Sequence, residues 1–299
     1  MNIFETCVAY AVYIVQLTSS VRYLFILNVV INAILAVTAT LGNGMIIVAI
    51  SRTPNLQTPS YLLITSLAFT DLLVGLVYHP LQIVLNVFFL HNNVHGVCKI
   101  FKTFNFISIL LGLLSFIMSA CISIDRYLAL RLMHRYRVVV TKKKVGLMIL
   151  LAWSLGIVLA SYSTQTNLFL CYGTVIFSIL VVFLLLTCFF YFKAMRTLQL
   201  YSLQVHAQHP PHYGFDVLKY KKLLKTMFLI FGCLLFCFLP ILCSHIARLN
   251  LDLSRETILV YFASHVALAL NSSVNPVIYL IRFTEIRQAC KKLILNYRD

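Results

Sequence analysis

The stretch from residue 103 to residue 130 reads TFNFISILLGLLSFIMSACISIDRYLAL, and it decides the fold class. Its first 22 residues, Thr103 to Ile124, carry no charge, and Asp125 and Arg126 follow directly. A helix of about 20 apolar residues crosses a bilayer. The stretch therefore predicts a transmembrane helix that ends in charged residues at a membrane boundary.

Similar windows recur along the chain of 299 residues. They cover residues 23–51, 53–97 with only Asp71 as an interruption, 145–192, 226–247 and 257–281. The window 145–192 is too long for one helix, and its polar segment SYSTQTN at 161–167 divides it into two. The windows together predict seven transmembrane helices.

The composition excludes most other classes of protein. Hydrophobic residues make up 61% of the chain and charged residues 11%, whereas soluble domains have about 45–50% and about 25%. An ordinary soluble enzyme and a disordered chain are therefore excluded. We expect an all-α membrane protein, a seven-transmembrane helix bundle with a short amphipathic eighth helix.

The distribution of basic residues predicts the orientation. The net charge is +16, which can indicate nucleic-acid binding. If the N-terminus lies outside, however, 19 of the 24 Lys and Arg residues fall in inner segments, as the positive-inside rule requires. We therefore expect the bilayer as a partner and no nucleic acid. We expect residues 1–22 to form an outer segment that lies on the membrane and residues 23–281 to form the bundle. Residues 282–299 should form the amphipathic helix and a short cytoplasmic tail.

Polar residues inside the spans suggest a site. Such groups are expensive in a membrane and often functional, and the set comprises Asn43, Asp71, Ser115, Asn271, Ser272 and Asn275. One carboxylate with several oxygen donors suits a hard cation. Interhelical hydrogen bonds without an ion are the alternative, and spacing alone favours that alternative.

Other residues suggest a switch at the inner side. Asp125 and Arg126 can form an ion pair at the membrane boundary, or Arg126 can simply anchor to headgroups. Pro240 and Pro276 lie inside predicted helices and should kink them, and kinked helices can hinge.

These motifs together resemble the rhodopsin-like (class A) G protein-coupled receptors, over about residues 25–295. Six of the seven expected spans carry one motif each, in the family's order: Gly42-Asn43, Leu67-Ala68-Phe69-Thr70-Asp71, Asp125-Arg126-Tyr127, Trp153, Cys237-Phe238-Leu239-Pro240 and Asn275-Pro276-Val277-Ile278-Tyr279. Within the class, the chain loosely resembles the melanocortin, lysophospholipid, cannabinoid and adenosine subset.

The resemblance implies a function and several sites. The chain would be a receptor at the plasma membrane, not an enzyme, that binds an extracellular small-molecule or amphipathic ligand and activates heterotrimeric G proteins by nucleotide exchange. Coupling and activation would depend on Asp125, Arg126, Tyr127, Tyr191, Phe238, Pro240, Asn275, Pro276 and Tyr279. A seven-helix transporter or channel is the alternative.

The resemblance also favours the cation at the polar set. Asp71, Ser115, Asn271, Ser272 and Asn275 match an allosteric sodium site, and no covalent cofactor is expected because residues 256–281 contain no Lys to hold retinal. Cys98 and Cys171 match an extracellular disulfide, although Cys98 lies 28 residues before Arg126, a longer spacing than the family's. Cys7 is the rival partner, because it is the other cysteine in a clearly exterior segment. Cys290 matches a palmitoylation site.

The ligand pocket can be placed only by register from the motifs. Ser108, Ile109, Gly112, His245 and His265 fall on positions that face the pocket in similar receptors. Residues 103–124 contain no acid, so an anchor for an amine ligand of the usual kind is absent. Phe238 stands where the family usually has a switch Trp.

Overall fold

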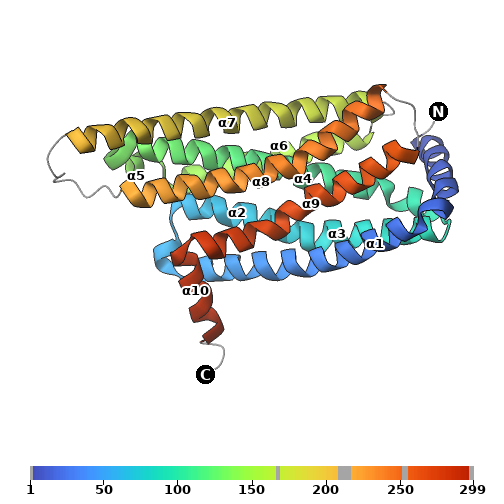
Figure 1. Cartoon of the computed structure of the whole chain (residues 1–299), viewed down its shortest axis with the longest axis horizontal. Helices are drawn as coiled ribbons and strands as arrows, with labels where there is room; N and C mark the ends of the chain where they lie inside the picture. Colours follow the sequence, from blue (N-terminus) through green and yellow to red (C-terminus); the bar gives the residue numbers. More distant parts are fainter. Residues whose placement is uncertain (1–2, 166–168, 208–216, 251–254, 296–299) are drawn as a thin grey trace.

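The computed structural model describes residues 3–165, 169–207, 217–250 and 255–295, and every regular element within them is helical. Figure 1 shows long helices running side by side along one axis. The long helices are α1 (Ile3–Arg52), α2 (Pro59–Leu73) with η2 (Val74–Tyr78) and α3 (His79–Leu90), α4 (Val94–Leu132), α6 (Lys142–Gln165), α7 (Phe169–Ala207), α8 (Val217–Asn250) and α9 (Arg255–Arg282). The short elements are η1 (Pro54–Leu56), η3 (Met133–Arg135), α5 (Tyr136–Val139) and α10 (Thr284–Leu295).

The expected seven-helix bundle is confirmed. Among the described residues, six helical stretches are long and apolar enough to cross a membrane, and α9 with the bent-off α10 adds a seventh. One stretch runs without interruption from Pro59 to Leu90 and combines α2, η2 and α3. The π-helical turn η2 lies where α1 approaches most closely, since a Cβ added to Gly75 would lie 2.8 Å from the Thr40 backbone nitrogen.

The helix α4 lies at the centre of the bundle. Its sequence is apolar on all sides, which is typical of a buried helix, and it packs against α2, α3, α6 and α7. Its fully buried side chains include Leu113, Leu114 and Met118. These apolar contacts position the charged end of α4 relative to the polar residues of α2 and α9.

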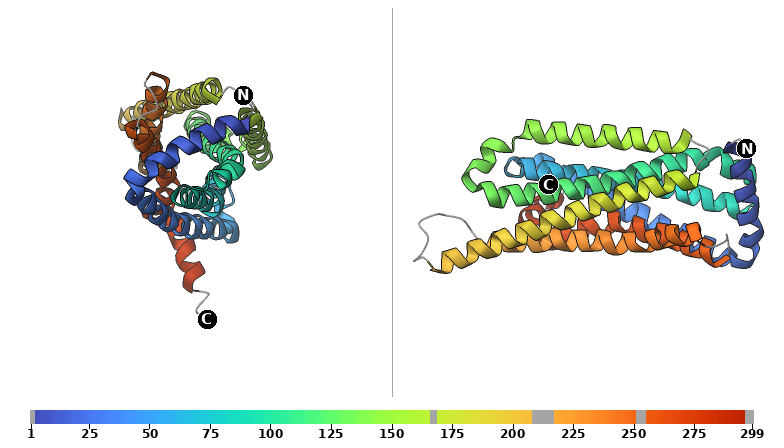
Figure 2. Two further views of the ribbon diagram at one scale, coloured as in Figure 1. Left: turned by 90° about the vertical axis from the view of Figure 1, so that its right-hand side faces the viewer. Right: turned by 90° about the horizontal axis from the view of Figure 1, so that it is seen from above.

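The first part of α1 lies across one end of the bundle. Residues 3–21, which we call the N-terminal helix segment, form this crossing part (Figures 1 and 2). Its side chains at Cys7, Ala11 and Ile14 are buried. These residues are spaced along one helix face, so this face packs on protein and not on the membrane surface.

The opposite end of the bundle carries α10. It leaves α9 at an angle of 98° and projects from the bundle in Figure 1. Ile286, Ala289 and Cys290 are buried, while Arg287, Lys291 and Lys292 are exposed. The predicted amphipathic eighth helix is thereby confirmed, although its apolar face contacts the bundle.

Candidate functional site

A buried carboxylate forms the middle of the candidate site. Asp71 on α2 has no exposed surface. Its Oδ1 accepts a hydrogen bond of 2.7 Å from the Ser272 hydroxyl, and its Oδ2 accepts one of 2.7 Å from the Asn275 amide. Both donors lie on α9, so α2 and α9 are joined through one charge. No ion pair to Asp71 is found within the described part of the chain.

Several acceptors near this carboxylate lack donors. The side-chain oxygens of Asn43, Asn271 and Asn275 are buried and have no hydrogen-bond partner in the described residues. The amide nitrogen of Asn43 donates to the Ser272 backbone oxygen at 2.9 Å, which links α1 to the same part of α9. The Ser115 hydroxyl donates to the Leu111 backbone oxygen at 3.1 Å.

This donor set suits a hard cation. A buried carboxylate is costly unless a positive charge or proton compensates it, and its two partners here are neutral. Oxygen atoms of carboxylates, amides and hydroxyls are the ligands that such cations prefer. The predicted residues Asp71, Ser272 and Asn275 are in direct contact, while Ser115 on α4 and Asn271 on α9 are buried on helices beside them.

A second buried charge lies at the end of α4. The Arg126 guanidinium pairs with the Asp125 carboxylate, and both side chains are buried. The Tyr136 hydroxyl on α5 also donates to Asp125, and the Ser60 hydroxyl donates to it at 2.9 Å. We call these four residues the inner latch. Sequence reasoning missed Ser60 and Tyr136, because no local pattern connects residues 60 and 136 with residue 125.

Burial and the Asp125 charge raise the pKa of the Tyr136 phenol well above its usual value. The phenol therefore keeps its proton at physiological pH and remains a donor. Each oxygen of Asp125 accepts at least one hydrogen bond. The inner latch thus satisfies its buried charges from within the protein.

The remaining predicted activation residues lie at different depths of the bundle. Tyr191 on α7 and Tyr279 on α9 are buried, and the Tyr279 hydroxyl has no hydrogen-bond partner in the described residues. Tyr127 packs its ring against Phe190 with centroids 5.6 Å apart. Phe238 packs edge-on against Phe116 on α4, with centroids 4.7 Å apart.

Pro240 and Pro276 lie inside α8 and α9, as predicted. Pro276 is pressed against α1, since a Cβ added to Gly42 would lie 2.9 Å from the proline ring. Only glycine at position 42 permits this approach. The proline turn of α9 therefore packs tightly against a neighbouring helix.

The predicted pocket residues lie on three helices. Ser108, Ile109 and Gly112 are half-buried on α4, and a Cβ added to Gly112 would meet no atom within 4 Å. His245 on α8 stacks on Phe177 with ring centroids 4.1 Å apart, and His265 on α9 is buried. A separate hollow of about 560 Å³ is lined by Thr174, Ser178 and Val182, which are exposed on the outer surface of α7, so it is not this pocket.

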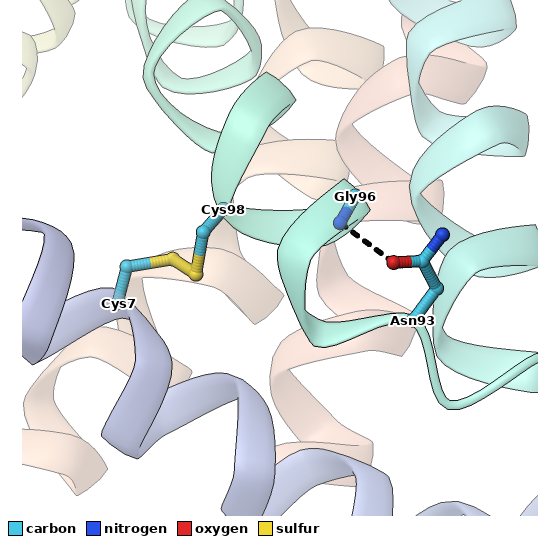
Figure 3. The surroundings of a disulfide bond; sticks show 4 residues. All are labelled: Cys7, Asn93, Gly96 and Cys98. Atoms are coloured by element: carbon cyan, nitrogen blue, oxygen red, sulfur yellow. Dashed lines mark hydrogen bonds between the residues drawn. A yellow bond between two sulfur atoms is a disulfide. The ribbon is translucent and has the colours of Figure 1, made fainter.

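The predicted disulfide between Cys98 and Cys171 is wrong. Cys98, near the start of α4, is bonded to Cys7 of the N-terminal helix segment (Figure 3). The physical reason is that this segment crosses the bundle end and brings Cys7 beside α4. Cys171 lies in the first turn of α7, and its side chain is outside the described residues.

The predicted palmitoylation site is not presented to the membrane in this structure. The Cys290 side chain is 2% exposed and packs with Ile286 and Ala289 against the bundle. Burial also raises the pKa of its thiol, which lowers its reactivity. Acylation of Cys290 would first require α10 to turn away from the bundle.

A family model described as the 7 transmembrane receptor (rhodopsin family) matches residues 42–279. This range includes Asn43, Asp71, Asp125, Arg126 and Tyr279. The chain belongs to the rhodopsin family of seven-transmembrane receptors. It is therefore a multi-pass membrane receptor and not an enzyme.

Individual relatives are distant and diverse. The receptor is 25% identical to melanocortin receptor 4 of Danio rerio over 87% of this chain and 81% of that protein. It is 24% identical to the histamine H2 receptor of Rattus norvegicus over 89% and 78%. The match to adenosine receptor A3 of Ovis aries has 29% identity but spans only 46% of this chain and 41% of that receptor. These receptors are named after different ligands, so the matches support membership of the family and do not identify a ligand.

Proposed function

We propose that the receptor lies in the plasma membrane with its N-terminus outside, binds an extracellular small-molecule or amphipathic ligand, and activates heterotrimeric G proteins by promoting nucleotide exchange. The observation that carries this proposal is the inner latch. A buried arginine is held by an adjacent carboxylate at the inner end of the bundle. Once released, its guanidinium could bind a partner protein there.

The orientation has two independent supports. Most basic residues lie in the segments at the α10 end of the bundle, which the positive-inside rule assigns to the cytoplasm. The Cys7–Cys98 disulfide lies at the opposite end, and disulfides persist in oxidising exterior compartments.

The receptor would switch between two helix arrangements that bind the ligand with unequal affinity. A ligand shifts the balance only by the difference in its affinity for the two arrangements. Movement of α8 and α9 at Pro240 and Pro276 would separate the elements around Arg126 and free its guanidinium from Asp125. The receptor itself makes or breaks no covalent bond.

A sodium ion at Asp71 belongs to the same proposal. Asp71, Ser115, Asn271, Ser272 and Asn275 would hold it, and the unpartnered oxygens of Asn43 and Asn271 support this assignment. The ion would supply the positive charge that the buried carboxylate lacks. It would thereby favour the arrangement in which α2 and α9 are drawn together.

Arg126→Ala tests the function. Membranes carrying the parent receptor should accelerate nucleotide exchange on added heterotrimeric G protein, and Arg126→Ala should lose nearly all of this acceleration at equal surface expression. Arg52→Ala is the matched control, because Arg52 is an exposed arginine at the same end of the bundle. Ion flux measured on the same membranes separates the receptor from a channel or transporter, and full exchange activity in Arg126→Ala would contradict the proposal.

A further inference from the structure

The N-terminal helix segment closes the outer end of the bundle. In Figures 1 and 2 it runs across that end, whereas the rest of α1 runs along the bundle. Ala11 and Ile14 are fully buried, and Cys7 is 6% exposed. Val12 and Gln16 on the same segment are exposed. The segment therefore has one face seated on the bundle and one face turned away from it.

The seated face belongs to the same packed cluster as residues that lie one helical turn from the predicted ligand pocket. Ala11 and Ile14 belong to one cluster of packed side chains with Phe104 and Leu111 of α4 and Ala269 of α9. Phe104 and Leu111 lie one helical turn on either side of Ser108, and Ala269 lies one turn from His265. The segment and the pocket thus share the same apolar walls.

Both ends of the segment are fastened. Cys7 is bonded to Cys98 at the start of α4, and the other end continues into the membrane-spanning part of α1. Figure 3 shows that Cys98 lies in a helical turn fixed by the Asn93 cap, whose side chain accepts a hydrogen bond of 2.8 Å from the Gly96 nitrogen. The disulfide therefore joins the segment to a well-anchored part of the bundle.

We propose that residues 3–21 form a lid on the ligand pocket, locked by the Cys7–Cys98 disulfide. The receptor then takes a ligand small enough to lie beneath this helix, and a folded protein ligand that needs an open vestibule is excluded. This inference rests on the proposed position of the pocket at the outer end. It assigns to the N-terminal segment the role of closing this end of the bundle.

The test measures access to the pocket and needs neither ligand nor G protein. A cysteine is placed in the pocket by Ser108→Cys, and intact cells are treated with a membrane-impermeant methanethiosulfonate reagent. The rate of modification is compared between Ser108→Cys alone and Ser108→Cys combined with Cys7→Ser and Cys98→Ser. The modification rate is also measured in the same two receptors without Ser108→Cys, because the exposed thiol of Cys243 would react with the reagent as well.

Unlocking the lid should speed modification of residue 108 at least about tenfold, because the reaction then no longer waits for a local opening of a fastened segment. Ile14→Ala, which keeps the disulfide but removes a buried side chain, should speed it less, and Val12→Ala on the exposed face should leave it unchanged. Equal rates with and without the disulfide in receptors that reach the cell surface would overturn the lid, as would no reaction in either. A receptor that fails to activate G proteins but shows the rate difference would contradict the proposed function and leave the lid intact.

Discussion

Two buried carboxylates in this receptor are stabilised in opposite ways. Asp125 pairs with Arg126 and accepts hydrogen bonds from Ser60 and Tyr136, so the inner latch is complete within the protein. Asp71 accepts two hydrogen bonds from neutral groups and lies among unpartnered oxygens. The first site contains its counter-charge, whereas the second has none among the described residues. On the proposed function, the same residue type would form an internal ion pair at one site and hold a cation at the other.

The largest expected effect comes from breaking the complete site. Asp125→Asn leaves the Arg126 guanidinium buried without a counter-charge, which typically costs about 3–5 kcal/mol. Arg126 is close to the membrane boundary, so we expect the lower end of this range. The solubilised variant should unfold several degrees below the parent in a thermal scan, and its G protein activation without ligand should rise. An unchanged melting temperature would show that the latch is not a stabilising pair.

A smaller and ion-dependent effect is expected at the incomplete site. Asp71→Asn keeps the shape of the side chain and removes the charge that would bind sodium. When choline in the buffer is replaced by sodium at ten times the sodium dissociation constant, the parent should be stabilised by about 1.4 kcal/mol. The variant should show no such shift in its thermal unfolding. Equal sodium responses in parent and variant would place the ion elsewhere or exclude it.

The smallest effect should come from one hydrogen bond of the inner latch. Tyr136→Phe removes a donor to Asp125 and leaves the ion pair, so we expect a loss of about 1 kcal/mol, because Tyr136 is only half-buried. The pKa of Tyr136 is raised in the folded protein, so its contribution is fully present below the pKa of about 10 of a free phenol and is lost only as pH rises above it. The difference in melting temperature between parent and variant should therefore stay constant through neutral pH. A difference that changes between mildly acidic and neutral pH would point to another group.

The sequence predicted the elements of the fold better than their long-range connections. The charge-free windows identified the seven helices, because burial in a bilayer imposes a simple length and composition. The contact of Asp71 with Ser272 and Asn275 also followed from the motifs. By contrast, Ser60 and Tyr136 come from segments with no pattern of their own, and only the packed structure brings them to Asp125.

The disulfide shows where the motif argument failed. The long spacing between Cys98 and Arg126 was a signal that the usual pairing did not fit. The partner, Cys7, lies in a segment whose apolar residues predicted contact with the membrane surface. Apolar periodicity alone cannot distinguish a helix seated on lipid from one seated on protein, because both bury the same face.

The contact between Gly42 and Pro276 makes α9 a lever with unequal arms. His265 lies eleven residues before this fulcrum and Tyr279 three residues after it, which are distances of roughly 16 Å and about 4.5 Å along a helix. A tilt of α9 about this contact would displace the backbone at His265 about four times as far as the backbone at Tyr279. A large displacement of α9 near the pocket would then produce only a small displacement beside the inner latch.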